Sequence, residues 1–243
     1  MRKILSFVYG IFAYVMFLSV STYGIGFVGN LVVKKSIDTE DLESFPTALA
    51  VDILLIALFG IQHSVMARKG FKKNLRKLLP QHLERSTFVI STSVVLMVLF
   101  HNWRSMPATI WDVSDPIASG FLWGMFAMGW LLLFASTFLI DHFDLFGLKQ
   151  VYCYLRQIEY HEPRFVTPAL YKYVRHPSYV GVLIAFWATP HMTIGHLVFA
   201  VAMTLYIRVG IAFEENGLIA EFGDVYRKYQ REVPMLIPYL RKR

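Results

Sequence analysis

Ionisable and aromatic side chains gather at the ends of the apolar stretches in this sequence. They come from four segments: Gln62, His63, Ser64 and Arg68; Asp141, His142 and Asp144; Tyr173, Arg175, His176 and Tyr179; and Glu214 with Glu215. If the apolar stretches cross a membrane, these segments lie at one depth and on one side, so we predict a shared site there. The alternative is that the ends of spans tolerate polar residues anyway. It accounts well for Arg68 but less well for the clustered histidines and acids.

These residue types suit a small zwitterion with carboxylate, amino and hydroxyl groups. Arg175 or His176 can pair with a carboxylate, and Glu214 or Glu215 with an ammonium group or a ribose diol. Three tyrosines nearby in the sequence, Tyr173, Tyr179 and Tyr229, offer aromatic faces that attract a sulfonium or an adenine. S-adenosylmethionine carries all of these groups. A dinucleotide suits the same residues, so the residue types alone leave both ligands open.

The elements that must position this site are membrane helices. The 243 residues are 56% hydrophobic and 17% charged, more apolar and less charged than a typical soluble domain. Residues 4–33 contain no charged side chain, and about 20 apolar residues suffice to cross a bilayer. Further apolar blocks cover residues 46–67, 87–103, 117–140 and 179–213. We therefore expect an all-α integral membrane protein with about four long transmembrane helices and a C-terminal helical hairpin.

The hairpin is predicted because the last block is too long for one span. Its sequence contains Thr189-Pro190-His191, and proline removes a backbone donor and disfavours helix before it. Gly120 and Gly124 have the spacing of small residues at a close helix contact. We expect a single domain over residues 1–243, with the cofactor-binding part from about residue 170 onward.

Basic residues predict the orientation, because short cytoplasmic loops are enriched in Lys and Arg. Both ends of the chain are basic, and the connection from Arg68 to Arg85 carries seven basic residues, whereas the third connection has only Arg104. This pattern predicts cytoplasmic termini and a cytoplasmic-side active site. The net charge of +7 is then explained by topology and by contact with anionic lipid, so we expect no nucleic-acid partner.

Other motifs carry less functional weight. Residues 24–29 read G-I-G-F-V-G, which matches the dinucleotide-binding pattern, but that pattern has meaning only between a strand and a helix, so we interpret it as close packing. His191 and His196 have no carboxylate or cysteine beside them in the sequence that would complete a metal site. The single cysteine, Cys153, excludes a multi-cysteine site, so no metal is expected. Asp52, an acid within a predicted span, is a weaker candidate site residue.

The C-terminal third resembles a known superfamily. The segments RHPSYVGVLIAFW and EENGLIAEFGDVYRKYQREVPMLIP are similar to the cofactor-binding region of the isoprenylcysteine carboxyl methyltransferase superfamily. From about Leu58 onward, LFGIQHSVMARKGFKK, IDHFDLFGLKQVY and TPALYKYVRHPSYVG resemble its NnrU-like branch, the methanethiol S-methyltransferases. Residues 1–50 match no motif. The HPxY element also occurs in membrane reductases that use NADPH.

The resemblance implies methyl transfer from S-adenosylmethionine to methanethiol, which gives dimethyl sulfide and S-adenosylhomocysteine. Matched position by position, it implies cofactor contacts at Arg175, His176, Tyr179, Gly181, Glu214 and Glu215. It places His63, His142 and Asp144 on the acceptor side. Because the pKa of a small thiol lies above neutrality, a base helps the reaction, and we expect His142 or His63 to accept the thiol proton while Asp144 orients the imidazole. Alternatively, the charge of the cofactor lowers the pKa of the thiol enough for water to accept the proton.

Other functions remain open at this stage. They are methylation of another thiol, a prenylcysteine or a lipid, reduction by NADPH, and a non-enzymatic transporter or scaffold in which the interfacial charges only anchor helices. The expected partners are a small thiol and the lipid bilayer, with no obligate protein partner. The expected location is the inner membrane of a bacterium.

Overall fold

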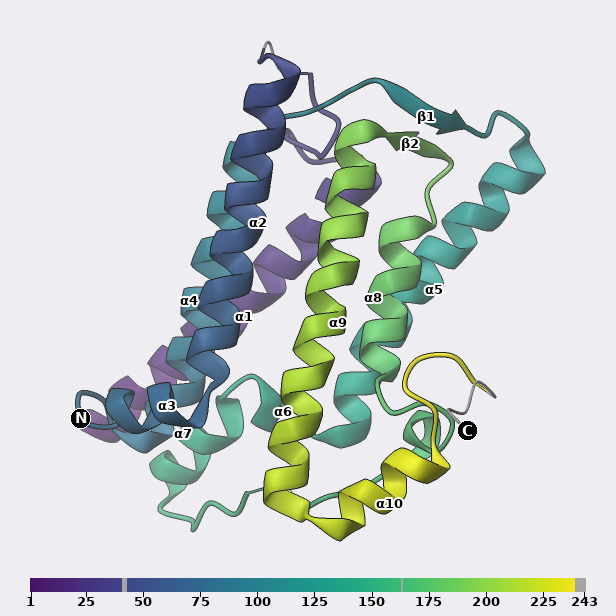
Figure 1. Cartoon of the computed structure of the whole chain (residues 1–243). Helices are drawn as coiled ribbons and strands as arrows, with labels where there is room; N and C mark the ends of the chain where they lie inside the picture. Colours follow the sequence, from purple (N-terminus) through teal and green to yellow (C-terminus); the bar gives the residue numbers. More distant parts are fainter. Residues whose placement is uncertain (41–42, 163, 239–243) are drawn as a thin grey trace. The chain divides into compact units, whose positions relative to one another are not determined.

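The structure is a computed structural model that describes residues 1–40, 43–162 and 164–238. Within these residues, five helices are long and apolar enough to cross a membrane: α1 (Arg2–Gly29), α2 (Phe45–Ala67), α4 (Gln81–Asn102), α5 (Pro116–Ile140) and α9 (Ile194–Phe222). Shorter elements are α3 (Lys69–Leu75), α6 (His142–Leu145), α7 (Leu148–Arg156), the 3-10 helix η1 (Ala169–Lys172), α8 (Pro177–Trp187) and α10 (Asp224–Glu232). The expectation of an all-α integral membrane protein is confirmed (Figure 1).

The chain divides into two compact units. The first comprises residues 1–108 and 141–163, and the second comprises residues 109–140 and 164–243. The single methyltransferase domain expected from the sequence stays a prediction.

In the first unit, α4 packs against α1 and α2, and α1 also packs against α7. The connections at one end of these helices are tied down by buried polar contacts. Trp103 is fully buried and donates from Nε1 to the Ile37 carbonyl at 3.1 Å. Asp52, the acid within a predicted span, is also fully buried, and it accepts a hydrogen bond from the Arg104 backbone N–H at 2.9 Å. Asp52 therefore anchors the connection that follows α4.

The glycine-rich end of α1 serves close packing, as predicted. A Cβ added at Gly24 would lie 3.2 Å from the Phe100 ring, and one added at Gly26 would lie 2.7 Å from the Leu31 carbonyl oxygen. The chain then turns back at Asn30, whose φ of 53° is a left-handed conformation that ends the helix.

In the second unit, α5 packs along α8 through two glycines. A Cβ added at Gly129 would lie 2.6 Å from the Gly181 carbonyl oxygen, and one added at Gly181 would lie 2.5 Å from the Gly129 carbonyl oxygen. The two backbones touch directly at this point. The prediction of close packing at Gly120 and Gly124 was wrong, because a Cβ at either position would meet nothing in the described chain. The small residues that matter lie one turn further along α5 and on α8.

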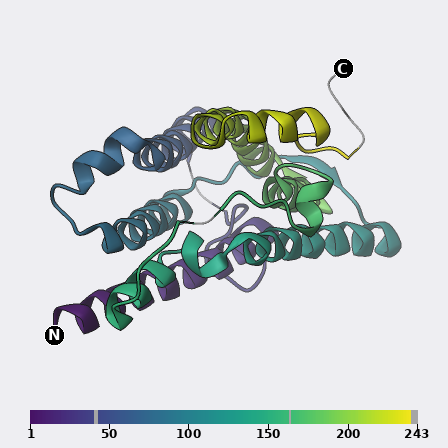
Figure 2. The ribbon, with the colours of Figure 1, turned by 90° about the horizontal axis from the view of Figure 1, so that it is seen from below.

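The break predicted in the last apolar block is confirmed. Helix α8 ends at Trp187, the strand β2 (His191–Thr193) pairs antiparallel with β1 (Thr109–Asp112), and α9 starts at Ile194. The strand pair was not predicted. Helix α9 continues through Glu214 and Glu215 to Phe222, because glutamate is a good helix former. It ends before Gly223, whose φ is 57°, and α10 then runs across the end of α9, as Figures 1 and 2 show.

Candidate functional site

Glu215 is the centre of a buried polar cluster in the second unit, at the end of α8 and α9 that lies opposite the strand pair (Figure 1). Its Oε1 accepts hydrogen bonds from Arg175 Nε at 2.6 Å and from His176 Nε2 at 3.0 Å. Its Oε2 accepts from Gln230 Nε2 at 2.9 Å. Because an ionised carboxylate only accepts, the Nε2 of His176 must carry the proton. One carboxylate thus joins the segment before α8, helix α9 and helix α10.

Arg175 and His176 also hold the segment that follows α10. The Arg175 guanidinium donates from Nη1 to the carbonyls of Gln230 at 3.0 Å and Val233 at 2.5 Å. The backbone N–H groups of Arg175 and His176 donate to the carbonyls of Pro234, at 2.9 Å, and Met235, at 3.2 Å. The R-H-P motif therefore fixes the position of residues 233–235 through both its side chains and its backbone.

Glu214, the neighbour of Glu215, has a different environment. Its side chain is 44% exposed, against 10% for Glu215. Its Oε2 accepts a hydrogen bond from the Tyr179 hydroxyl at 2.9 Å, and its Oε1 lies 3.9 Å from Nδ1 of His176. The structure therefore brings five of the predicted cofactor residues together, but only one of the two glutamates is buried at the centre of the cluster.

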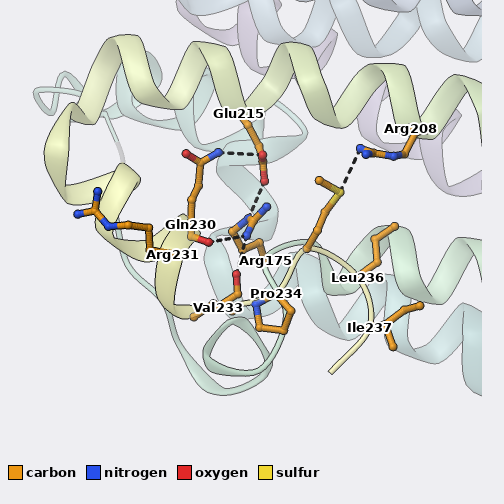
Figure 3. Close-up of a pocket in the computed structure, with 10 residues that line it drawn as sticks. Arg175, Arg208, Glu215, Gln230, Arg231, Val233, Pro234, Leu236 and Ile237 are labelled. Carbon is orange, nitrogen blue, oxygen red and sulfur yellow. Dashed lines mark hydrogen bonds and ion pairs between the residues drawn. The ribbon is translucent and has the colours of Figure 1, made fainter. Parts of the chain in front are cut away.

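A pocket of about 450 Å³ opens beside this cluster (Figure 3). Its lining combines polar side chains with an apolar wall formed by the segment after α10. The lining residues are Arg175, Arg208, Glu215, Gln230, Arg231, Val233, Pro234, Met235, Leu236 and Ile237. Cavities of ~300–1,000 Å³ with an apolar lining and a few convergent polar groups are typical of small-molecule sites. The pocket is therefore a place where a small ligand can bind next to the cluster.

The remaining predicted cofactor residues, Tyr173, Gly181 and Tyr229, are not among the residues that line the pocket. Gly181 lies against Gly129, as described above, and Tyr173 is 63% exposed. Tyr229 is buried and donates from its hydroxyl to the Tyr171 carbonyl at 2.5 Å, and its ring packs against Phe165. Burial raises the pKa of Tyr229 to about 12, so its hydroxyl keeps its proton. These positions give Gly181 and Tyr229 a packing role that the sequence reasoning did not foresee.

In the first unit, His142 is held by a partner from α1. It follows the N-cap residue of α6 and is buried, and its Nε2 lies 2.8 Å from the Tyr14 hydroxyl. The rings of Phe17 and Phe146 lie against it. Burial lowers the pKa of His142, because desolvation disfavours the imidazolium. A neutral, oriented imidazole at neutral pH is suited to accept a proton.

The Asp144 carboxylate, predicted to orient that imidazole, has other partners. Its Oδ1 accepts from the Tyr160 hydroxyl at 2.8 Å and from Gln150 Nε2 at 3.3 Å. Burial raises the pKa of Asp144, and the Tyr160 hydrogen bond opposes that shift. Nearby, Asp141 caps α6 and pairs with Lys149. The carboxylates of this segment thus shape the connection between α6 and α7, while Tyr14 is the hydrogen-bond partner of His142.

His63, the other predicted proton acceptor, lies near the end of α2. Its Nδ1 is 3.5 Å from the Thr92 hydroxyl, and its ring packs between Phe59 and Phe88. The neighbouring helix α4 also carries Arg85, whose Nε donates to the Leu145 carbonyl at 2.6 Å. In the part of the chain that the structure describes, no group of three His, Cys, Asp or Glu side chains is arranged to hold a metal ion.

Sequence reasoning missed four residues of these two clusters: Tyr14, Tyr160, Arg208 and Gln230. Arg208 had a readable signal, since it is a charged residue within an apolar block. Tyr14 had none, because its contact with His142 joins positions 128 residues apart.

Comparison with protein families matches residues 52–233 to the family described as NnrU protein. A relative from Crocosphaera subtropica named methanethiol S-methyltransferase is 48% identical over 97% of this chain and 92% of its own length. Another so named, from Mycobacterium tuberculosis, is 47% identical over 98% of both chains. Methanethiol S-methyltransferase 1 of Bradyrhizobium diazoefficiens is 51% identical over 98% of this chain and 84% of its own length. No solved structure matches the chain significantly.

Proposed function

Because the chain belongs to the NnrU protein family, we propose that it is a membrane enzyme that transfers the methyl group of S-adenosylmethionine to methanethiol and so produces dimethyl sulfide. The observation that carries the proposal is 47% to 51% identity, over almost the whole chain, to relatives named methanethiol S-methyltransferase. A membrane methyltransferase also agrees with the five long apolar helices.

We place the methyl donor in the pocket beside Glu215. The pocket volume of about 450 Å³ lies within the range of small-molecule sites, and its lining offers guanidinium groups for a carboxylate and an apolar wall for the rest of the ligand. Both carboxylate oxygens of Glu215 already accept hydrogen bonds, so this residue acts by holding the wall in place. Glu214 and Tyr179 are bonded to each other and do not line this pocket, so their predicted contacts with the cofactor are kept as a separate proposal.

When bound, S-adenosylmethionine supplies an electrophilic methyl group on a positively charged sulfur. The chain's task is to orient the thiol, exclude water and accept the thiol proton. Neutralisation of charge in such a displacement is favoured in a water-excluded site, and alignment contributes part of the ~7–11 kcal/mol that orientation can provide.

We assign the proton to Nε2 or Nδ1 of His142. The Tyr14 hydroxyl at 2.8 Å fixes the ring, and burial keeps the imidazole neutral. A methanethiol pKa above neutrality makes such an acceptor useful, because the thiolate is the nucleophile. His63 is the second candidate, and Asp144 acts by shaping the segment that carries His142.

The experiment that tests the proposal is detection of the product. Cells that express the chain and receive methanethiol should release dimethyl sulfide, measured in the headspace by gas chromatography, and cells with an empty vector should not. The purified protein in detergent should show a thermal shift with S-adenosylhomocysteine and none with NADPH. A shift with NADPH alone, without dimethyl sulfide, would favour a reductase instead.

We further propose that the active site faces the cytoplasm of a bacterium, at the inner membrane, with both termini on that side. The support is the basic composition of both ends and of residues 68–85. Reporter fusions at the two termini should both report a cytoplasmic location; an external location for either one would contradict this topology.

A further inference from the structure

Arg208 is an unusual residue for its position in the chain. It lies within α9, a helix apolar enough to cross a membrane, between Ile207, which is buried, and Val209, which is 54% exposed. A charged side chain in such a segment is costly and generally faces a partner, a cavity or a functional site. Here it lines the pocket beside Glu215.

The partner of the Arg208 guanidinium, among the residues that the structure describes, is the sulfur of Met235, 3.3 Å from Nη1. A thioether sulfur is a weak acceptor and carries no charge, whereas a guanidinium has five N–H donors in a fixed, planar arrangement. Within the described residues, the side chain thus meets the wall of the pocket without a carboxylate to balance its charge.

The other charges of the pocket are already engaged or face elsewhere. Arg175 is balanced by Glu215 at 2.6 Å, and Glu215 has both oxygens occupied by protein donors. Arg231 projects from α10 away from the other labelled side chains, as Figure 3 shows. The charged residues of the lining are three arginines and one glutamate, so the lining has a net positive charge. Arg208 is the arginine whose charge is available to a ligand in the pocket.

The spacing along α9 gives the ligand a direction. Arg208 and Glu215 are seven residues apart, which places them on the same face of the helix about 10 Å apart along its axis. The apolar side chains of Met235, Leu236 and Ile237 line the same pocket. A ligand that fits has an anionic group at the Arg208 end and extends from there toward Glu215 and Gln230.

We propose that Arg208 binds the carboxylate of the methyl donor and so sets the direction in which that molecule lies in the pocket. A planar guanidinium forms two parallel hydrogen bonds with a carboxylate, which a lysine or a neutral side chain does not reproduce. This inference rests on the proposed function, because the carboxylate is that of the amino-acid part of S-adenosylmethionine. The phosphate of an anionic lipid headgroup offers the same charge, and the experiment separates the two.

The test compares two ligands that differ in the carboxylate. Calorimetry on the full chain in nanodiscs of neutral lipid should give an affinity for S-adenosylhomocysteine that falls about 10-fold or more in R208Q, with partial recovery in R208K. For decarboxylated S-adenosylhomocysteine, which lacks only the carboxylate, the same R208Q change should have little effect. The matched control is R227Q, which removes an equal charge from an exposed arginine of α10 paired with Asp224, and it should leave both affinities unchanged.

The outcomes are distinct. An equal loss of affinity for both ligands in R208Q would mean that Arg208 only supports the pocket, and unchanged affinity would mean that the carboxylate binds elsewhere; either result overturns the inference. If nanodiscs with phosphatidylglycerol weaken S-adenosylhomocysteine binding in the wild type but not in R208Q, the site holds a lipid phosphate and the assignment is wrong. Failure of the wild type to bind S-adenosylhomocysteine at all would overturn the proposed function as well.

Discussion

Replacing Glu215 with glutamine tests whether one carboxylate assembles the site. The change keeps the size of the side chain but removes its charge and turns one oxygen into an N–H donor. The glutamine can accept at its remaining oxygen, but its amide nitrogen faces a donor, either Gln230 or the Arg175 and His176 pair. The adjacent Glu214→Gln is the matched control, because it makes the same chemical change at an exposed position.

The expected magnitude follows from burial. The side chains of Arg175 and Glu215 are 9% and 10% exposed, so E215Q leaves a buried guanidinium without its counter-charge. Breaking a buried ion pair by removing one partner costs ~3–5 kcal/mol, and we expect about 3 kcal/mol because the glutamine oxygen keeps one bond. Glu214, with a side chain 44% exposed and one hydroxyl partner, should contribute less than ~1 kcal/mol.

The assay is thermal unfolding of the purified chain in detergent, followed by calorimetry with S-adenosylhomocysteine. At ~2–4 °C per kcal/mol for a chain of this size, E215Q should lower the Tm by about 6–12 °C and E214Q by no more than about 4 °C. E215Q should also weaken ligand binding, because residues 233–235 lose the charge that holds Arg175. Equal Tm changes for the two variants, or a neutral E215Q, would refute the view that Glu215 organises the pocket.

Three further predictions concern packing and titration. Gly181→Ala should lower the Tm in detergent by several degrees or prevent folding, because its Cβ would lie 2.5 Å from a backbone oxygen. Gly124→Ala is the control and should leave the Tm unchanged, because its Cβ would enter open space. Equal changes in Tm for the two variants would contradict the packing described. Tyr14→Phe should lower kcat and leave the affinity for S-adenosylhomocysteine intact. Because burial lowers the pKa of His142, the wild-type rate should fall only at a pH below the ordinary range of histidine titration. A rate that falls at pH 6.5 in both proteins would contradict this role of His142. The raised pKa of Asp144 means that the folded chain holds this proton more tightly than the unfolded chain. The stability that the protonated carboxyl contributes is therefore lost as the pH rises from about 4 toward neutrality. In urea unfolding, Asp144→Asn should gain stability relative to the wild type over that range, and a difference in unfolding free energy that stays constant with pH would argue against the shift.

Much of the fold was predictable because its signals are local. The spans follow from runs of apolar residues, and the break at Thr189-Pro190 follows from the restrictions that proline places on the backbone. The strand pair of β1 and β2 was missed because each strand has only three or four residues and its partner is about 80 residues away.

The types of residue in the site could be predicted from the sequence, but the role of each residue could not. Glu214 and Glu215 look equivalent in the sequence, but adjacent residues on a helix point about 100° apart, and only one of them faces Arg175. Which face is buried depends on the segment after α10, whose position is set by tertiary contacts. Tyr229 was counted as a ligand contact for its aromatic face, although Tyr226 three residues earlier marks the apolar side of an amphipathic helix.

The direct contact between Gly129 and Gly181 has a consequence for how the site responds to the lipid around it. Helix α8 has 11 residues and is about 16 Å long, roughly half of the ~30 Å hydrocarbon thickness, so hydrophobic matching cannot set its depth. Its depth is set by its backbone contact with α5, which is long enough to cross. The His176–Pro177 start of α8 should therefore keep its position relative to α5 when the bilayer becomes thicker or thinner. The depth of this part of the binding cluster therefore depends on the position of α5 and not on the length of α8 itself.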